Sequence, residues 1–355
     1  MFRRIIIRLL LSPFSLLYGL IISFVNFSYD IGLLKSSKFS IPVIGVGNLS
    51  IGGAGKTPHI EYLIELLKDY LDLATLSRGY KRETKGFRYV THQDTALTVG
   101  DEPLQYRRKY PDIVVSVSES RAYAVPQILQ QYPNMQTILL DDAFQHRAIQ
   151  PGLNILLTAY DSLFTQDYLL PSGRLREWRS GYSRADIIIV TKCPVILDET
   201  ERQKIIAEIN PKPYQRVYFS YYEYGYPYYF YDPKQRISLD GDLDVILLSA
   251  IASTDYLLQY LENIVHTVHE IEFEDHHIFD RHDIEKMINV YKHLDKERKI
   301  ILTTEKDAMR LELHKETMQS HKLPVFILPL RVKFHFEDGP VFDEDIKKYL
   351  LDFMV

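Results

Sequence analysis

A glycine-rich stretch near the start of the chain has the residue types that bind phosphate. The segment "SIGGAGKT" ends in Gly55, Lys56 and Thr57, the last three positions of the pattern G-x-x-x-x-G-K-[ST]. In such a loop, backbone N–H groups surround phosphate oxygens, the lysine contacts the terminal phosphates and the hydroxyl binds Mg²⁺. Ser50 replaces the first glycine, but it still permits a tight turn, and two glycines follow it. The residues predicted to bind the nucleotide are Ser50, Ile51, Gly52, Gly53, Ala54, Gly55, Lys56 and Thr57.

Two further stretches place carboxylates where a phosphate site needs them. "QTILLDD" is an apolar run that ends in Asp141 and Asp142, and a carboxylate at the end of such a strand holds Mg²⁺ directly or through water. For one of the two aspartates, a helix cap or a solvated end is the competing interpretation. "GDEP" places Asp101 and Glu102 before a proline. Its local pattern favours a solvated turn, and the alternative is a carboxylate that accepts the proton of an attacking hydroxyl.

A pair of histidines follows two acids in "FEDHHIFD". Asp275, His276 and His277 form either a polar surface turn or a histidine that orients a carboxylate base. Their spacing is not that of a zinc motif.

Arginines that can bind phosphate with forked hydrogen bonds occur in three places. "PSGRLRE" carries Arg174, Arg176 and Glu177 after a proline–glycine turn, while Arg78 and Arg121 stand singly in "LSRGYKR" and "SESRAYAV". From the local pattern alone, a charged loop is the competing interpretation for each of them.

The elements around these residues predict an α/β fold. "PVIGVGNL" predicts a buried strand before the glycine loop, and residues 59–71 repeat apolar side chains on one helical face. Apolar strands at residues 73–77, 112–118, 136–142, 153–159 and 185–192 then alternate with helical stretches. Such alternation favours a parallel sheet with both faces covered.

The aromatic segment "YFSYYEYGYPYYFY" (residues 218–231) interrupts this alternation. It predicts two short strands around a turn, which either connect two domains or form another hairpin of one domain. Strands and helices resume after it. We therefore expect an apolar N-terminal helix in residues 1–35, a P-loop domain in 36–217, a two-stranded linker in 218–240 and a smaller α/β domain in 241–355.

Composition excludes some classes of protein. The chain has 355 residues and a formal net charge of -5, so no strong general attraction to nucleic acid is expected. Its single cysteine, Cys193, excludes an internal disulfide and a cysteine-rich metal site.

The first residues are apolar and follow two arginines. Residues 9–27 contain no charge and approach the length that spans a bilayer. Pro13 and Gly19 weaken a spanning interpretation, and no small-residue cleavage site follows that would support a signal peptide. A helix on the membrane surface is favoured, with a true span or a helix packed on its own protein as alternatives.

Other nucleotide-binding classes fit less well. "VTKCP" lacks the aspartate of the guanine-reading motif, and in "TTEKD" the lysine and aspartate are adjacent, which disfavours GTP. The partitioning ATPases carry an extra lysine where this chain has Ile51. A P-loop ATPase that switches a protein partner nevertheless stays open as the alternative function.

Taken together, the motifs resemble those of the tetraacyldisaccharide 4'-kinase family of lipid A synthesis. They are "VGNLSIGGAGKTP", "LSRGYKR", "GDEP", "DDAFQHR", "PSGRLRE", "FEDHHIF" and "TTEKDAMRL", in this order, and the resemblance extends to about residue 311. Ser50 fits the family's loop, which has Ser or Thr there. Ala143 and Arg174 depart from it, where Gly and Pro are usual.

The resemblance implies two α/β/α domains joined by a two-stranded linker. It implies transfer of the γ-phosphate of ATP, with Mg²⁺, to the 4'-hydroxyl of an acylated glucosamine disaccharide 1-phosphate. The place would be the cytoplasmic face of the inner membrane, with a peripheral or single-helix anchor. Asp101 would be the base, oriented by His276, and Thr57, Asp141 and Asp142 would bind the metal. The residues that would complete the catalytic set are Lys56, Arg121, Arg176 and Glu177.

Overall fold

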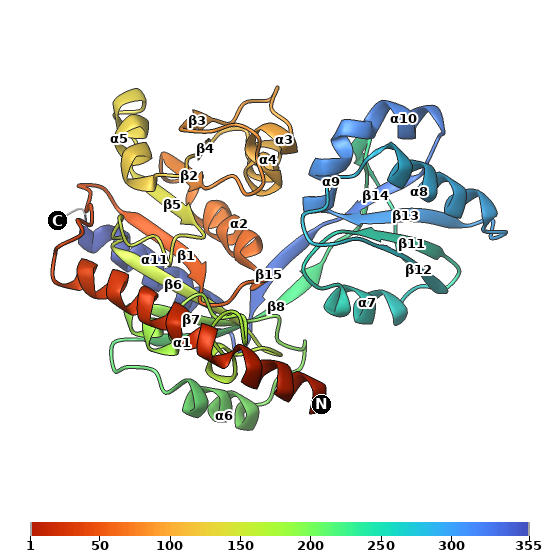
Figure 1. Cartoon of the computed structure of the whole chain (residues 1–355). Coiled ribbons are helices and arrows are strands. Elements are labelled where there is room, and N and C mark those ends of the chain that lie inside the picture. The colour runs from red at the N-terminus through yellow and green to blue at the C-terminus, as the bar shows by residue number, and fades with distance from the viewer. Residues whose placement is uncertain (1, 354–355) are drawn as a thin grey trace.

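The computed structural model describes residues 2–353 as two α/β domains that stand side by side (Figure 1). A nine-stranded sheet forms the large domain and a six-stranded sheet the small one. Helix α1 (Phe2–Asp30) runs along the large domain. The predicted fold class, two α/β domains with the phosphate loop in the first, is confirmed.

The large sheet is parallel except at its two edges. Its strand order is β15-β8-β7-β6-β1-β5-β2-β4-β3, and only β15 and β3 run antiparallel to their neighbours. Its strands are β1 (Val43–Asn48), β2 (Leu73–Ser77), β3 (Arg88–Tyr89), β4 (Val114–Val117), β5 (Thr137–Asp141), β6 (Leu153–Ala159), β7 (Ile187–Thr191), β8 (Arg216–Tyr224) and β15 (Leu330–Phe334). The central strands are buried along their whole length, as their continuous apolar sequences require.

Helices cover both faces of the large sheet. Alternate residues of each strand point to opposite faces, so Ile44 packs in the cluster with α2, whereas Val43 packs in the cluster with α5. The helices of this domain are α2 (Lys56–Leu67), α3 (Ala96–Val99), α4 (Asp101–Lys109), α5 (Arg121–Gln131), α6 (Glu199–Ile209) and α11 (Gly339–Phe353), with 3₁₀ turns η1 (Phe164–Gln166) and η2 (Arg179–Arg184).

The small sheet has the strand order β10-β9-β14-β13-β11-β12. Its strands are β9 (Tyr228–Tyr229), β10 (Asp232–Arg236), β11 (Asp244–Ser249), β12 (Thr267–Glu272), β13 (Lys299–Thr304) and β14 (Val325–Leu328). Its helices are α7 (Asp255–Glu262), α8 (Arg281–His293), α9 (Glu305–Leu311) and α10 (Lys315–Ser320), with the 3₁₀ turn η3 (Glu312–His314). The strands β11 to β14 pair in parallel, as the resumed α/β alternation predicted.

The aromatic segment, residues 218–231, connects the domains, but its strands do not pair with each other as a hairpin. Its first strand, β8, pairs with β7 and β15 in the large sheet. After Gly225 the chain enters the small sheet, where β9 pairs with β14 and β10. The two strands that run between the domains in Figure 1 are therefore β8 and β15, which are far apart in sequence. Local alternation could not reveal a partner about a hundred residues away.

The end of the chain also differs from the expected boundary, which assigned residues 241–355 to the small domain. Strand β15 rejoins the large sheet, and α11 packs on that domain. Phe342, Ile346 and Leu350 form its buried stripe at helical spacing. The Tyr349 hydroxyl meets the backbone of Val43 at 3.2 to 3.3 Å. The amphipathic pattern of a helix indicates that one face is buried, but not against which sheet.

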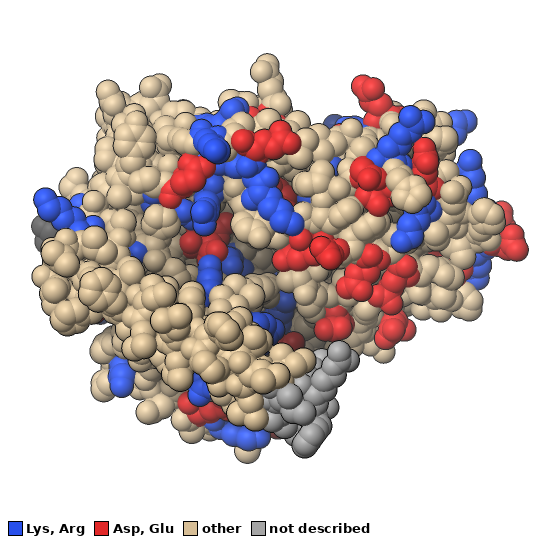
Figure 2. Space-filling model, in the orientation of Figure 1, with Lys and Arg blue, Asp and Glu red and all other residues tan. Residues whose placement is uncertain are grey.

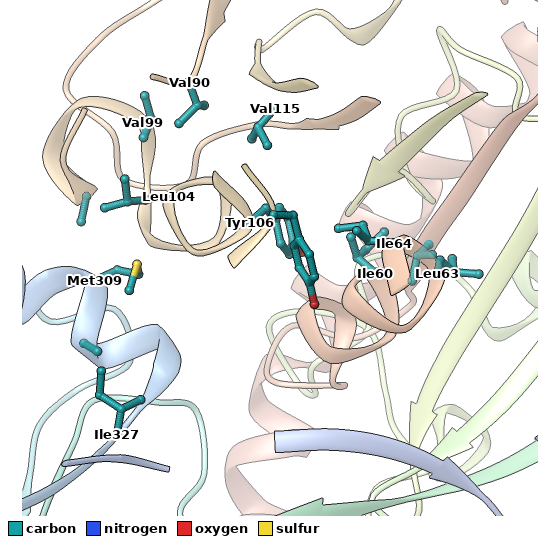
Figure 3. Packing of buried hydrophobic residues seen from close by; sticks show 14 of the residues in the cluster. Ile60, Leu63, Ile64, Val90, Val99, Leu104, Tyr106, Val115, Met309 and Ile327 are labelled. Carbon is teal, nitrogen blue, oxygen red and sulfur yellow. The ribbon is translucent and has the colours of Figure 1, made fainter. Parts of the chain in front are cut away.

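A single apolar core continues from one domain into the other. Tyr106 on α4 lies beside Ile60 and Ile64 of α2, and Met309 and Ile327 of the small domain belong to the same cluster (Figure 3). The contact between α4 and α9 is thus a packed interior.

Charged groups accompany this apolar contact. The ammonium of Lys109 lies 2.7 Å from Glu61 on α2 and 2.9 Å from Glu305 on α9. Both carboxylates are buried, and burial raises the pKa of Glu61 to about 7 although Lys109 opposes the shift. The neighbouring Arg108 makes a more exposed bridge to Glu312, at 2.9 Å.

These two bridges predict unequal effects on stability. Lys109→Met leaves two buried carboxylates without their shared cation, and we expect the free energy of unfolding to fall by about 3 kcal/mol. Arg108→Met removes a partly exposed pair and should cost less than about 1 kcal/mol. Urea denaturation of both variants measures the difference. Equal losses would contradict the larger contribution that burial gives to the Lys109 bridges.

Candidate active site

The phosphate loop lies between the carboxyl end of β1 and the start of α2. Its backbone has positive φ at Gly52 (113°) and Gly55 (83°), which residues with a Cβ rarely adopt. A Cβ on Gly55 would also lie 2.3 Å from the Tyr222 hydroxyl oxygen. The N-terminus of α2, beginning at Lys56, adjoins the loop, so free N–H groups and the helix dipole both favour an anion. Positive φ at two glycines and the start of a helix beside them are features that a phosphate loop needs.

A cavity of about 500 Å³ extends from the loop into the space between the domains. All eight residues predicted to bind the nucleotide line it. The small domain contributes the segments around Ala252, His276 and Lys306. In Figure 2, charged side chains of both signs gather around the hollow between the domains. A ligand bound at the loop would therefore contact both domains.

Lys56 and Asp142 belong to one polar network beside the loop. The Lys56 ammonium donates to Asn48 Oδ1 at 3.1 Å and lies 3.6 Å from Asp142. Arg176 donates to both carboxylate oxygens of Asp142, at 2.8 and 3.0 Å. Burial disfavours the charged form of Asp142, but Lys56 and Arg176 outweigh it and hold its pKa well below the usual range. Asp142 is therefore a carboxylate at neutral pH.

Asp141 behaves differently from its neighbour. Its Oδ2 accepts a hydrogen bond from the Tyr106 hydroxyl at 3.0 Å, whereas its Oδ1 is buried without a partner among the described residues. Burial, together with the charge of Glu102, raises the pKa of Asp141 to about 7. A buried carboxylate oxygen without a hydrogen-bond donor suits a cation.

The residues fit a magnesium ion that is completed by phosphate and water. Thr57, in the loop, and Asp141 and Asp142, beside it, all line the cavity. Their side chains offer oxygen atoms, which are the ligands that Mg²⁺ prefers. Within residues 2–353 no group of three or more His, Cys, Asp or Glu residues could hold a metal by itself. Mg²⁺ commonly uses one or two protein ligands with substrate phosphates, so Thr57, Asp141 and Asp142 remain a prediction for its ligands.

Asp101 and His276 meet across the domain boundary. Asp101 is the first residue of α4 and is buried, contrary to the solvated turn that its local pattern favoured. Its Oδ2 lies 2.9 Å from His276 Nδ1 and 3.6 Å from Arg310 Nε. Burial opposes ionisation, but Lys306, His276 and Arg310 hold the pKa of Asp101 well below its usual range. An ionised carboxylate thus orients the histidine.

The histidine, and not the aspartate, reaches the cavity, which exchanges the expected roles of Asp101 as the base and His276 as the group that orients it. His276 lines it, with Nε2 at 3.2 Å from the Lys306 ammonium, whereas Asp101 lies behind the ring. His276 also has a positive φ of 57°, an unusual conformation for a residue with a side chain. The pair can accept a proton from a hydroxyl in the cavity at His276 and stabilise the resulting cation with Asp101.

Three other predicted residues lie outside the cavity lining. Arg121 is buried behind the aspartates, with bonds of 3.4 and 3.5 Å to the carbonyls of Asp141 and Asp142, and burial lowers its pKa to about 10. Glu177 accepts from Arg184 at 2.8 Å and from Gln145. Their contacts support the backbone around the aspartates. Arg174 pairs with Asp167 instead, at 3.0 Å.

Sequence reasoning missed several residues that the structure brings to the site. Asn48 accepts from both Lys56 and Arg176, and Lys306 lies 3.1 Å from Glu102 and close to His276. Lys306 stands in the motif "TTEKD", which had no assigned role. Asn48 is the last residue of β1, and its position directly before the loop is a signal that could have found it.

The fold and the site define a P-loop enzyme of the kinase type: the phosphate loop and His276, which Asp101 orients, line the same interdomain cavity. Residues 7–351 match the family model of the tetraacyldisaccharide-1-P 4'-kinases, LpxK. The chain therefore belongs to the tetraacyldisaccharide 4'-kinase family.

Individual relatives agree with the family match. A tetraacyldisaccharide 4'-kinase of Bacteroides thetaiotaomicron is 40% identical over 96% of this chain and 92% of its own length. That of Flavobacterium johnsoniae is 44% identical over 90% of this chain and 92% of its own length. A crystal structure of LpxK from Aquifex aeolicus in complex with ATP is 30% identical, with a TM-score of 0.73 over 97% of this chain and 99% of that one. The resemblance and the enzyme class predicted from the motifs are confirmed.

The Asp101–His276 pair predicts a specific loss of turnover. We expect Asp101→Asn and His276→Gln each to lower kcat by about 10²-fold or more, because each removes part of the proton acceptor. The KM for ATP should change less than threefold, since neither side chain belongs to the phosphate loop. Steady-state kinetics measure both constants. Glu274→Gln, an exposed neighbour, is the control, and near-normal kcat in both site variants would refute the role of the pair.

Proposed function

We propose that the protein transfers the γ-phosphate of ATP to the 4'-hydroxyl of a tetraacyldisaccharide 1-phosphate in lipid A biosynthesis. The observation that carries this proposal is the convergence of the loop and the Asp101–His276 pair on one cavity in a chain of this family. The acceptor oxygen attacks the γ-phosphorus, the bond to the bridging oxygen breaks and ADP leaves. The proton of the hydroxyl goes to the His276–Asp101 pair.

The remaining residues position and neutralise the phosphates. Lys56 contacts the terminal phosphates, and the loop N–H groups hold the chain of phosphates against the start of α2. Arg176 keeps Asp142 oriented and ionised. Mg²⁺, held by Thr57, Asp141 and Asp142, would neutralise charge on the β- and γ-phosphates. Arg121 and Glu177 support these groups from behind the cavity.

Helix α1 gives the enzyme a surface for the membrane that holds an acylated substrate. Ile7–Asp30 is long and apolar enough to cross a membrane, and only 11% of its most apolar 18-residue stretch is buried inside the protein. Polar contacts fasten one side of the helix to its own domain: Tyr18 donates to the Arg176 carbonyl at 2.7 Å, and Trp178 to that of Gly19 at 3.1 Å. A helix fastened in this way lies on the bilayer surface, at the cytoplasmic face where ATP is available.

A second cavity supports placing the acceptor beside α1. It measures about 720 Å³ and lies between α1 and residues 167–180. Apolar residues such as Leu16 and Trp178 line it together with Arg8 and Arg179, a combination that suits an acylated, phosphate-bearing molecule. Leu175 lines this cavity and the next residue, Arg176, lines the nucleotide cavity, so the two cavities are neighbours.

Transfer of labelled phosphate tests the proposed function. Incubation with γ-labelled ATP, Mg²⁺ and the tetraacyldisaccharide 1-phosphate in detergent micelles should label the lipid, and Lys56→Met should abolish the label because it removes the cation at the terminal phosphates. Hydrolysis of ATP without lipid labelling, stimulated by a protein partner, would favour the ATPase switch instead.

The exposed face of α1 predicts membrane binding. We expect the triple change Leu10→Gln, Leu17→Gln and Phe24→Gln to lower the fraction bound to anionic phospholipid vesicles several-fold, because each exposed apolar side chain contributes about 2 kcal/mol when buried. Vesicle flotation measures binding. Ile196→Gln is the control, because Ile196 is an exposed apolar residue in the loop between β7 and α6. Unchanged flotation of the triple variant would show that another surface docks the enzyme.

A further inference from the structure

Strand β7 ends directly against the phosphate loop. The Thr191 hydroxyl donates to the carbonyl of Ala54 at 2.9 Å, which fixes the end of the strand to the middle of the loop. The backbone is held again two residues later, because Cys193 N–H donates to the Ser220 carbonyl at 2.9 Å and the Cys193 carbonyl accepts from Tyr256 at 3.2 Å. The residue between these anchors is Lys192, for which the sequence predicted no role beyond the end of a strand.

The backbone of Lys192 has the left-handed conformation, with a φ of 56°. A residue with a side chain adopts it at a cost of roughly 1 to 3 kcal/mol, and such residues cluster at functional sites when their surroundings hold them. Two other residues that line the same cavity, Asp142 and His276, have φ values of 50° and 57°. Lys192 thus shares an unusual backbone conformation with two residues of the proposed site.

The side chain of Lys192 faces the cavity and has no acidic partner. Its ammonium lies 3.7 Å from the point that a Cβ on Gly53 would occupy, at the crest of the loop. Among residues 7–353, whose side chains the structure describes, no carboxylate lies within 4 Å of the ammonium and no hydrogen bond involves it. Lys56, in contrast, is bound to Asn48 and lies near Asp142. Burial lowers the pKa of Lys192, although Asp161, Asp255 and Asp275 oppose the shift from a greater distance.

We propose that Lys192 is a second phosphate-binding lysine, whose ammonium contacts the phosphate chain of ATP at Gly53. A half-buried cation beside backbone N–H groups is what a polyphosphate needs, and the phosphate chain would supply the anionic partner that the protein does not. The proposal rests on the proposed function only in taking ATP as the nucleotide. In this proposal the lysine of "VTKCP" contacts the phosphates, whereas the guanine-binding motif that the segment partly matches recognises the base.

Binding without any acceptor tests this role. We expect Lys192→Met to weaken the binding of ATP about tenfold or more in isothermal titration calorimetry, and Lys192→Arg to stay within about threefold of the unchanged protein. Inorganic tripolyphosphate, used as a competitor that lacks the nucleoside, should lose affinity for Lys192→Met by a similar factor. Lys204→Met, whose side chain is 75% exposed on α6, is the matched control and should bind normally.

The outcomes separate phosphate contact from a structural role. ATP affinity within twofold of normal in Lys192→Met would overturn the proposal. So would a loss of ATP affinity without a matching loss for tripolyphosphate, which would place the contact at the nucleoside. Thermal melting without nucleotide shows whether Lys192→Met is folded, and Lys192→Gln replaces it if it is not. Failure of lipid labelling leaves these binding measurements unaffected, so it would count only against the proposed function.

Discussion

The buried contact between Asp101 and His276 is the constraint on which the site depends. The carboxylate belongs to the large domain, while His276, Arg310 and Lys306, which stabilise its ionised form, belong to the small one. An ionised carboxylate buried without such partners would cost several kcal/mol, so the pair exists only when the domains are together. The apolar contact of α4 with α9 and the bridge from Lys109 to Glu305 hold the two domains together. The geometry of the proposed proton acceptor therefore depends on the packing of the domains.

The surroundings of the phosphate loop also depend on how the two domains are packed together. Tyr222 on the connecting strand β8 occupies the space that a side chain on Gly55 would need, and Tyr256 of the small domain donates towards its backbone. Ala252 of the small domain approaches Gly53 so closely that a Cβ there would lie 3.1 Å from it. The small domain therefore forms a wall of the cavity over the loop. Such a wall favours phosphoryl transfer, because it excludes water and so strengthens the interaction of the phosphates with charged groups of the protein.

The sequence predicted the elements better than their partners. Buried strands appear as apolar runs and the loop as a local pattern, so the α/β class and the nucleotide site follow from short windows. The pairing of β8 with β15 could not be predicted, because it joins residues about a hundred positions apart. Asp101 shows the same limit, since two acids before a proline indicate a solvated turn unless a distant histidine is known to cover them. Only the family resemblance, which reflects the assembled site, paired Asp101 with His276.

Lys192 went unassigned for a related reason. As sequence, "VTKCP" is a failed match to a guanine-binding motif, and a failed match says nothing about what the lysine contacts. The proposed contact depends on two facts that only the fold provides: β7 ends beside the loop, and the backbone at Lys192 turns left-handed between two anchored neighbours. The open sheet places the carboxyl ends of β1, β5 and β7 along one edge, so a residue that ends any of them can reach the phosphates. Position at that edge, more than agreement with a motif, indicates which charged residues serve the nucleotide.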